Sequence, residues 1–159
     1  MTRRFVGVIV GLCAILLACL CVFLVSHHFI RNPWIYSAPA VSAIMNERPI
    51  LIETMVTPDD RDMGLSGRRL VPRGYAMRFL FDRPAVYPFW MQGMWVPLDI
   101  VWVRDGVVVD RVRLDPPRTI FSVPATYVPH EVGDTVYEFA AGEADVYGLN
   151  RGTRMRVVY

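Results

Sequence analysis

The chain has 159 residues, 53% of them hydrophobic, and a formal net charge of +2, and its length allows one domain. Charges of both signs are interspersed without a basic stripe, so nucleic-acid binding is not expected. All 17 basic residues are arginine, which excludes Schiff-base chemistry on lysine.

The N-terminus carries an uninterrupted apolar run, Phe5–Val25, directly after Arg3 and Arg4. At about 1.5 Å per residue, a helix of this length spans roughly 30 Å, the thickness of a bilayer core. We therefore predict a signal anchor with one transmembrane helix at residues 1–31. Because positive charge precedes the run, the N-terminus is expected in the cytoplasm. The protein would be a single-pass inner-membrane protein with a periplasmic C-terminal domain.

Two other interpretations of this segment stay open. A cleaved signal peptide would release the domain into the periplasm, although its apolar region is typically only about 7–15 residues long. The segment Leu16–Cys19 resembles a lipobox, which would make the protein a lipoprotein. The residues that follow Cys19 stay apolar, which is unusual for the start of a mature lipoprotein.

Residues 32–49 have the composition of a tether, with three prolines and no sustained hydrophobic period. The folded domain is then expected at residues 50–159, which is long enough to bury a core. It opens with a β-rich run, Ile50–Val56. Thr57 follows as an N-cap before proline and two aspartates, so a short helix is predicted to about Met63, ending at Gly64.

Alternating apolar side chains at Met77, Phe79 and Phe81 predict a half-buried strand. The Asp105-Gly106 pair between Leu98–Arg104 and Val107–Leu114 is typical of a type I′ hairpin turn.

A two-residue hairpin loop would pair Trp102 with Val109 and place Asp110 opposite Val101. A second helical turn is predicted near Gly142–Tyr147, and a last strand at Thr153–Tyr159. Many short strands with one or two short helices favour a mainly β fold, an antiparallel sandwich or partly open barrel.

The densest apolar stretch of the domain, Phe89–Val103, contains three tryptophans, two methionines and one carboxylate. No nucleophile–base pair, metal-ligand spacing or phosphate loop lies within it. Its order of FWM, a short gap, PLD-I and an aromatic strand resembles the signature of domain-of-unknown-function family 192.

Three further segments resemble that family in the same order. Arg61, Gly64, Leu65 and Arg68 resemble its R-x-x-G-L-x-x-R element, Ala76–Phe81 its G-M-L-F-x-F strand, and Tyr137–Gly142 its V-L-E-L-P-A-G segment. The family is widespread in bacteria and archaea and has no established activity, so the resemblance implies a fold rather than a reaction. Where the family usually has Lys-Asn-Thr after FWM, this chain has Gln92, Gly93 and Met94. A ligand site built by that polar triplet in relatives would be lost or altered here.

Asp99 is the first candidate site residue. It is either a buried carboxylate that serves as a general acid or ligand contact, or a structural group whose oxygens accept backbone N–H bonds near Pro97. In the predicted register Asp110 lies diagonal to Asp99 on the same face. The two carboxylates could share a cation or work as an acid–base pair, or Asp110 could face solvent. Glu138 is the other candidate for a second acid.

Arginines are the second group of candidates, because their forked donors suit carboxylate, phosphate or sugar-acid ligands. Arg61 and Arg68 match the family element. The alternative is that these arginines pair with nearby acids, for which the sequence offers Asp59, Asp60, Asp62, Asp82 and Glu138.

Cysteine and histidine are too sparse for a metal centre. All three cysteines lie within the first 21 residues, and His130 is the only histidine beyond residue 28. We therefore expect no disulfide, no metal site and no cofactor in the domain. No G-x-S-x-G element accompanies His130, so a serine hydrolase triad is not expected.

The leading hypothesis is a non-enzymatic, membrane-tethered periplasmic binding or accessory module. A small ligand or an envelope protein would contact Arg61, Arg68, Trp90, Met91, Met94, Trp95 and Asp99. Met94 and Trp95 are expected to project outward from a loop shaped by Gly93, as a contact surface. The alternative is a small hydrolase or lyase in which Asp99 acts with Asp110 or Glu138.

Overall fold

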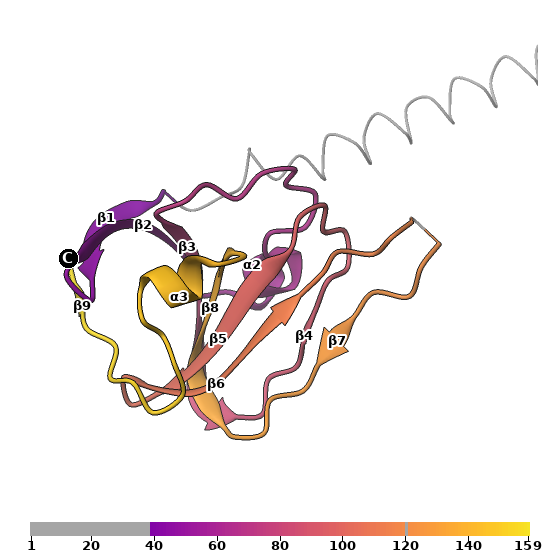
Figure 1. The fold of residues 1–159 in the computed structure, drawn as a ribbon. Helices are drawn as coiled ribbons and strands as arrows, with labels where there is room; N and C mark the ends of the chain where they lie inside the picture. Colours follow the sequence, from indigo (N-terminus) through magenta and orange to yellow (C-terminus); the bar gives the residue numbers. More distant parts are fainter. Residues whose placement is uncertain (1–38, 120) are drawn as a thin grey trace, which may run out of the picture. The chain divides into compact units, whose positions relative to one another are not determined.

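The computed structural model describes residues 39–119 and 121–159 (Figure 1). The predicted signal anchor at residues 1–31 lies outside the described residues. Within the described part, no helix is long and apolar enough to cross a membrane.

Seven strands form one curled sheet in the order β6-β5-β8-β3-β2-β1-β9 (Figure 1). These strands are β1 (Val41–Met45), β2 (Arg48–Met55), β3 (Tyr75–Ala85), β5 (Leu98–Arg104), β6 (Val107–Leu114), β8 (Gly133–Ala140) and β9 (Val157–Val158). A second, two-stranded sheet pairs β4 (Phe89–Trp90) with β7 (Thr126–Tyr127). Two short helices complete the described part, α2 (Pro58–Met63) and α3 (Glu143–Val146). The predicted mainly β class is confirmed.

The sheet is a half-barrel of mixed direction. All its neighbouring strands are antiparallel except β2 and β3, which run parallel. Parallel neighbours need a crossover connection, and the segment that contains α2 provides it. The predicted antiparallel arrangement is therefore wrong for this one pair.

The C-terminal segment reaches both edges of the sheet. β9 pairs with β1, while Arg154 forms an isolated bridge with Val107 at the start of β6. Two backbone bonds flank that bridge, Val108 N–H to the Thr153 carbonyl at 2.9 Å and Met155 N–H to the Gly106 carbonyl at 2.8 Å. The curled sheet is thus nearly closed at this end. The predicted last strand, Thr153–Tyr159, is reduced to two residues plus this bridge.

The folded domain begins earlier than predicted. β1 and the first residues of β2 occupy residues 41–49, which the sequence pattern assigned to a tether. Pro49 is tolerated because it lies close to the start of β2, near the hairpin turn with β1. Buried Ala43 and Met45 show that this segment contributes to the core.

Both predicted helices are present. Thr57 caps α2, its hydroxyl accepting the Asp60 N–H at 3.2 Å, and Gly64 ends the helix with a positive φ of 47°. α3 lies within the predicted turn at residues 142–147, and Gly148 follows it with a φ of 65°.

The β5–β6 hairpin has the predicted strands and turn, but its register changes after two pairs. Val103 lies opposite Val108, whereas Trp102 lies opposite Asp110. Val109 is therefore the extra residue of a β-bulge. Because side chains alternate along a strand, this one residue moves Asp110 to the face opposite the one predicted.

The sheet buries a hydrophobic core on each face. One core lies on the side of α3 and contains Val101, Phe139, Tyr147 and Leu149. The other lies on the side of α2 and β4 and contains Leu65, Met77, Phe79, Met91, Ile100, Trp102 and Val136. Phe89 and Met91 of the FWM segment (Phe89–Met91) and Leu65 of the loop after α2 thus belong to the second core, whereas Trp90 is exposed.

Candidate functional site

Asp99 faces the α3 side of the sheet, where its carboxylate is fully engaged. Oδ2 accepts the backbone N–H groups of Gly142 and Ala144 at 2.7 and 3.1 Å. Oδ1 accepts Nε of Arg113 at 2.7 Å, and Arg113 lies directly opposite Asp99 on β6. The structural interpretation of Asp99 is thus the one that its contacts favour, with the N–H donors coming from the start of α3 rather than from the chain near Pro97.

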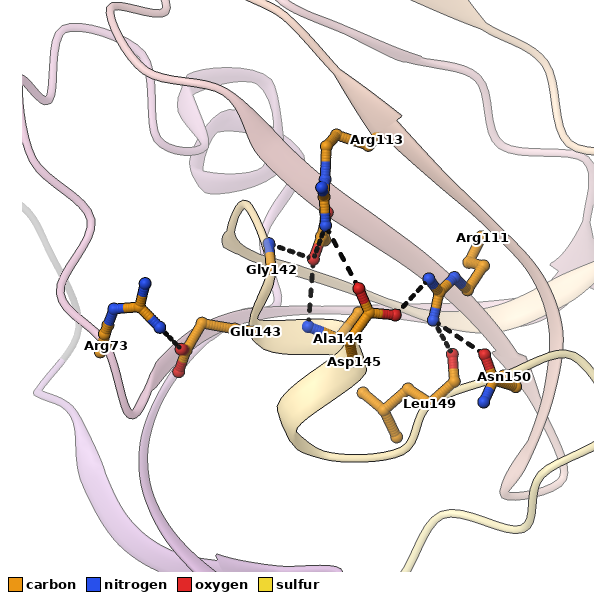
Figure 2. A network of polar contacts seen from close by, with 10 residues as sticks. Arg73, Arg111, Arg113, Gly142, Glu143, Ala144, Asp145, Leu149 and Asn150 are labelled. Carbon is orange, nitrogen blue, oxygen red and sulfur yellow. Dashed lines mark hydrogen bonds and ion pairs between the residues drawn. The ribbon is translucent and has the colours of Figure 1, made fainter.

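A chain of ion pairs extends from Arg113, the partner of Asp99, to Asp145 and Arg111 beside α3 (Figure 2). Arg113 also contacts Asp145 at 3.4 Å, and Asp145 accepts Nη2 of Arg111 at 2.6 Å. Arg111 in turn donates to the Leu149 carbonyl at 3.1 Å and to Asn150 at 3.0 Å. These contacts hold α3 against β5 and β6, and they give both oxygens of Asp99 a hydrogen-bond partner.

Asp110 lies on the other face and is also engaged. Oδ2 accepts the His130 backbone N–H at 2.8 Å, the Tyr127 hydroxyl at 3.2 Å and contacts His130 Nδ1 at 3.0 Å, while Oδ1 accepts the Arg111 N–H at 2.8 Å. Burial alone would raise the pKa of Asp110, but these hydrogen bonds lower it below its ordinary value. Asp99 and Asp110 therefore do not form the predicted pair.

Arg68 forms a buried ion pair with Glu53, which was not among the acids considered as its partners. Its Nη2 donates to both oxygens of Glu53, at 3.0 and 2.8 Å, and its Nη1 donates to the Tyr75 hydroxyl at 2.7 Å. Burial, followed by the hydrogen bond to Glu53, raises the pKa of Tyr75. This cluster fixes the β2–β3 connection to the sheet.

Arg61 anchors α2 to β3. Its Nη1 donates to the carbonyls of Val56 and Leu80, and its guanidinium lies 5.0 Å from the centre of the Phe81 ring. Both arginines of the R-x-x-G-L-x-x-R element thus hold the segment that carries Gly64 and Leu65 in place.

That segment forms one wall of a pocket of about 440 Å³. Five aromatic side chains line it: Phe79, Phe81, Tyr87, Phe89 and Trp90. Phe79 and Phe89 meet edge to face at 5.0 Å, and Phe81 stacks on Tyr87 at 3.6 Å. Paired rings in these arrangements are stabilised beyond their burial, so the wall is preorganised.

Glu138 lines the same pocket from the central strand β8. It is paired with Met77 of β3 and Ile100 of β5 and lies on the face of Val136. Its side chain is buried, and Oε2 has no hydrogen-bond partner among the described residues. Burial raises the pKa of Glu138 from 4.5 to about 8, although the charge of Arg68 and a backbone hydrogen bond from Leu65 act in the opposite direction.

The FWM segment and the loop after it lie partly as predicted. Gly93 has a φ of 70°, and Trp95 projects outward, 55% exposed, with the Arg69 guanidinium 5.1 Å from its ring centre. Met94 was predicted to project outward as well, which is wrong: it is buried in the α2-side core and lines the pocket. Met91 is fully buried in the same core.

The pocket thus brings together four of the candidates from the sequence, Arg61, Trp90, Met94 and Glu138. Arg68, Met91, Trp95, Asp99 and Asp110 are not among its lining residues. The other aromatic residues that line the pocket, Phe79, Phe81, Tyr87 and Phe89, were not predicted as site residues. Phe79 and Phe81 fell in a correctly predicted strand, but their alternation indicated only burial and not a cavity beside them.

Comparisons with known proteins agree on the fold. The model of a family described as Uncharacterized ACR, DUF192, matches residues 41–157. A Sinorhizobium meliloti 1021 protein, described provisionally as a transcription regulator, has a similar crystal structure with a TM-score of 0.60 and 25% identity; the match covers 74% of this chain and 92% of that chain. A protein of unknown function from Novosphingobium aromaticivorans DSM 12444 is similar at a TM-score of 0.59 and 22% identity, over 74% and 84% of the two chains. A search of curated proteins gives no match.

Proposed function

Because this chain belongs to domain-of-unknown-function family 192, which implies a fold but no reaction, we propose a function from the pocket itself. The domain is a non-enzymatic binding module that takes a small, largely apolar ligand between α2, β3 and β4. The observation that carries this proposal is the aromatic-walled pocket of about 440 Å³ with a single buried carboxyl, Glu138, in its lining. A mostly apolar cavity with few placed polar groups is the usual form of a small-molecule site.

The alternative hydrolase or lyase needs Asp99 in a water-accessible pocket beside a second acid. Asp99 instead faces α3 with its oxygens engaged, and Asp110 is held by His130 and Tyr127. The other carboxylate in the pocket lining, Asp62, is exposed on α2. No contact of these residues favours the enzymatic alternative. A role in transcription, suggested for the Sinorhizobium protein, gains no support from the interspersed charges of this chain.

The test compares two tryptophans of equal exposure. Trp90 is 54% exposed and lines the pocket, whereas Trp95 is 55% exposed and does not. Binding of the neutral apolar fluorophore N-phenylnaphthylamine should weaken at least about fivefold in Trp90→Ala, as expected for losing about 1 kcal/mol of apolar contact. Trp95→Ala should bind it like the wild type. Equal binding by all three proteins, or no binding by the wild type, would refute the proposal.

The location of the module is a separate proposal, which rests on the apolar run Phe5–Val25 and the arginines ahead of it. Alkaline phosphatase fused after Tyr159 should be active, and the full chain should sediment with membranes. An inactive fusion, or a soluble product trimmed near residue 40, would contradict the anchored, periplasmic location. Trp95 with Arg69 remains the proposed contact surface for an envelope protein.

A further inference from the structure

Glu138 differs from every other buried acid of the described domain. Glu53, Asp99, Asp110 and Glu143 are also buried, and each accepts at least two hydrogen bonds. Oε2 of Glu138 has none among the described residues. A buried polar atom without a partner is costly and calls for an explanation, which a bound ligand can supply.

Gly64 keeps the space next to this oxygen open. It ends α2 and lines the pocket. A Cβ placed on Gly64 would lie 3.7 Å from Oε2 of Glu138 and 3.4 Å from the Phe79 ring. A side chain at this position would therefore crowd both groups, and a glycine avoids that contact.

We infer that Oε2 of Glu138, carrying a proton, donates a hydrogen bond to an uncharged, largely apolar ligand that bears a carbonyl-type acceptor. This inference rests on the proposed binding function and specifies its ligand class. A neutral carboxyl group offers one O–H donor, and Leu65 supplies a backbone hydrogen bond to the same carboxyl. The O–H of Glu138 therefore remains as a donor for the ligand. It would form one hydrogen bond within an otherwise apolar contact.

The charged and titratable groups around Glu138 are few. Arg61 and Asp62 line the pocket from α2, Arg68 acts on Glu138 from the loop after it, and Tyr87 lies at the aromatic wall. The lining residues contributed by β3, β4 and β7 are uncharged. Arg61 is already bound to two backbone carbonyls and the Phe81 ring. An anionic ligand would meet an engaged cation, and an ammonium ligand would need Glu138 ionised in its apolar surroundings.

The expected pH dependence follows from the pKa of Glu138, which burial raises to about 8. Below this pH the carboxyl keeps its proton and can donate. Above it the donor is lost, and at one unit higher only about one tenth of the molecules retain it. Affinity for a carbonyl ligand should therefore fall up to roughly tenfold between pH 7 and pH 9.

The experiment uses four probes of nearly equal shape: acetophenone, ethylbenzene, 1-phenylethylamine and benzoate. Each titration uses the full chain of 159 residues. Binding is followed by NMR titration of the Trp90 indole signal. At pH 6.5, acetophenone should bind about three- to tenfold more tightly than ethylbenzene, and the charged probes more weakly than either.

Two variants separate the donor from the pocket. Glu138→Gln keeps a neutral donor, so it should retain the preference for acetophenone at every pH. Glu138→Leu should bind both probes equally. A preference for the amine that grows with pH would identify an ammonium site and overturn the inference, as would equal binding of acetophenone and ethylbenzene by the wild type. Failure of every probe to shift Trp90 would instead refute the binding function itself.

Discussion

Asp99 and Glu138 are buried carboxylates on neighbouring strands of one sheet, and they face opposite cores. Asp99 stands in the most recognisable motif of the chain, yet two backbone N–H groups and Arg113 engage its oxygens. Glu138 stands in a less prominent segment and retains an oxygen without a partner, beside a pocket. The carboxylate in the most prominent motif, Asp99, therefore has a structural role. The carboxylate with an oxygen that accepts no hydrogen bond, Glu138, lies at the candidate site.

The largest expected effect concerns the pH dependence of stability. Glu138 binds its proton more tightly in the folded domain, with a pKa of about 8 against an ordinary 4.5. Burial of Glu138 therefore does not lower the free energy of unfolding below pH 4.5, where the group is protonated in both states. The free energy of unfolding then decreases as the pH rises to about 8. The loss should be roughly 2–5 kcal/mol in the wild type. Urea unfolding at several pH values should show this decline, and Glu138→Gln should lack most of it. Equal slopes for both proteins would contradict an unsatisfied Glu138.

Asp99 should affect the stability of the domain but not ligand binding in the pocket. Asp99→Asn weakens a charged acceptor that serves Arg113, Gly142 and Ala144, so the free energy of unfolding at neutral pH should fall by roughly 1–3 kcal/mol. Probe binding in the pocket should stay at the wild-type level, because Asp99 lies on the other face. An unchanged melting curve together with weakened probe binding would give Asp99 the functional role instead.

Two glycines test whether the space beside Glu138 matters. Gly64 and Gly148 both have positive φ, 47° and 65°, but nothing lies within 4 Å of a Cβ on Gly148. Alanine should cost roughly 1–3 kcal/mol of stability at either position, because a positive φ is strained for a residue that has a Cβ. Acetophenone binding should weaken only in Gly64→Ala. A similar loss of binding in Gly148→Ala would show that stability, and not the open space, controls the affinity.

The smallest effect is expected at Trp95, which lies outside both cores. Trp95→Ala should change the free energy of unfolding by no more than about 0.5 kcal/mol, as for an exposed substitution. A fully packed tryptophan would cost about 3–5 kcal/mol. Thermal unfolding of the variant decides between these values, and a large loss would place Trp95 in the α2-side core rather than on a contact surface.

Local chemistry made the short elements predictable. Thr57 and Gly64 bound α2, and Asp105-Gly106 places the β5–β6 turn, because capping and turn preferences act between residues close in sequence. The bulge at Val109 has no such local signal. Its consequence, the position of Asp110 on the face of Trp102, was therefore predicted wrongly.

The pocket depends on contacts that no short segment encodes. Glu138 was a candidate from the sequence. That its Oε2 lacks a hydrogen-bond partner, however, results from how α2, β3 and β4 pack around β8. Met94 was expected on the surface because it replaces a polar residue of the family pattern. Whether it faces water depends on the path of the loop, which buries it against the α2-side core.

The last seven residues of the chain attach to both margins of the curled sheet, through β9 on one side and Arg154 on the other. Unpaired strand margins are the places where protein chains add to one another. The C-terminal segment therefore covers the outer side of β1 and the start of β6. Because Met155 and Val157 also pack against the α3-side core, removing this segment should expose strand margins to a second molecule and weaken that core at the same time.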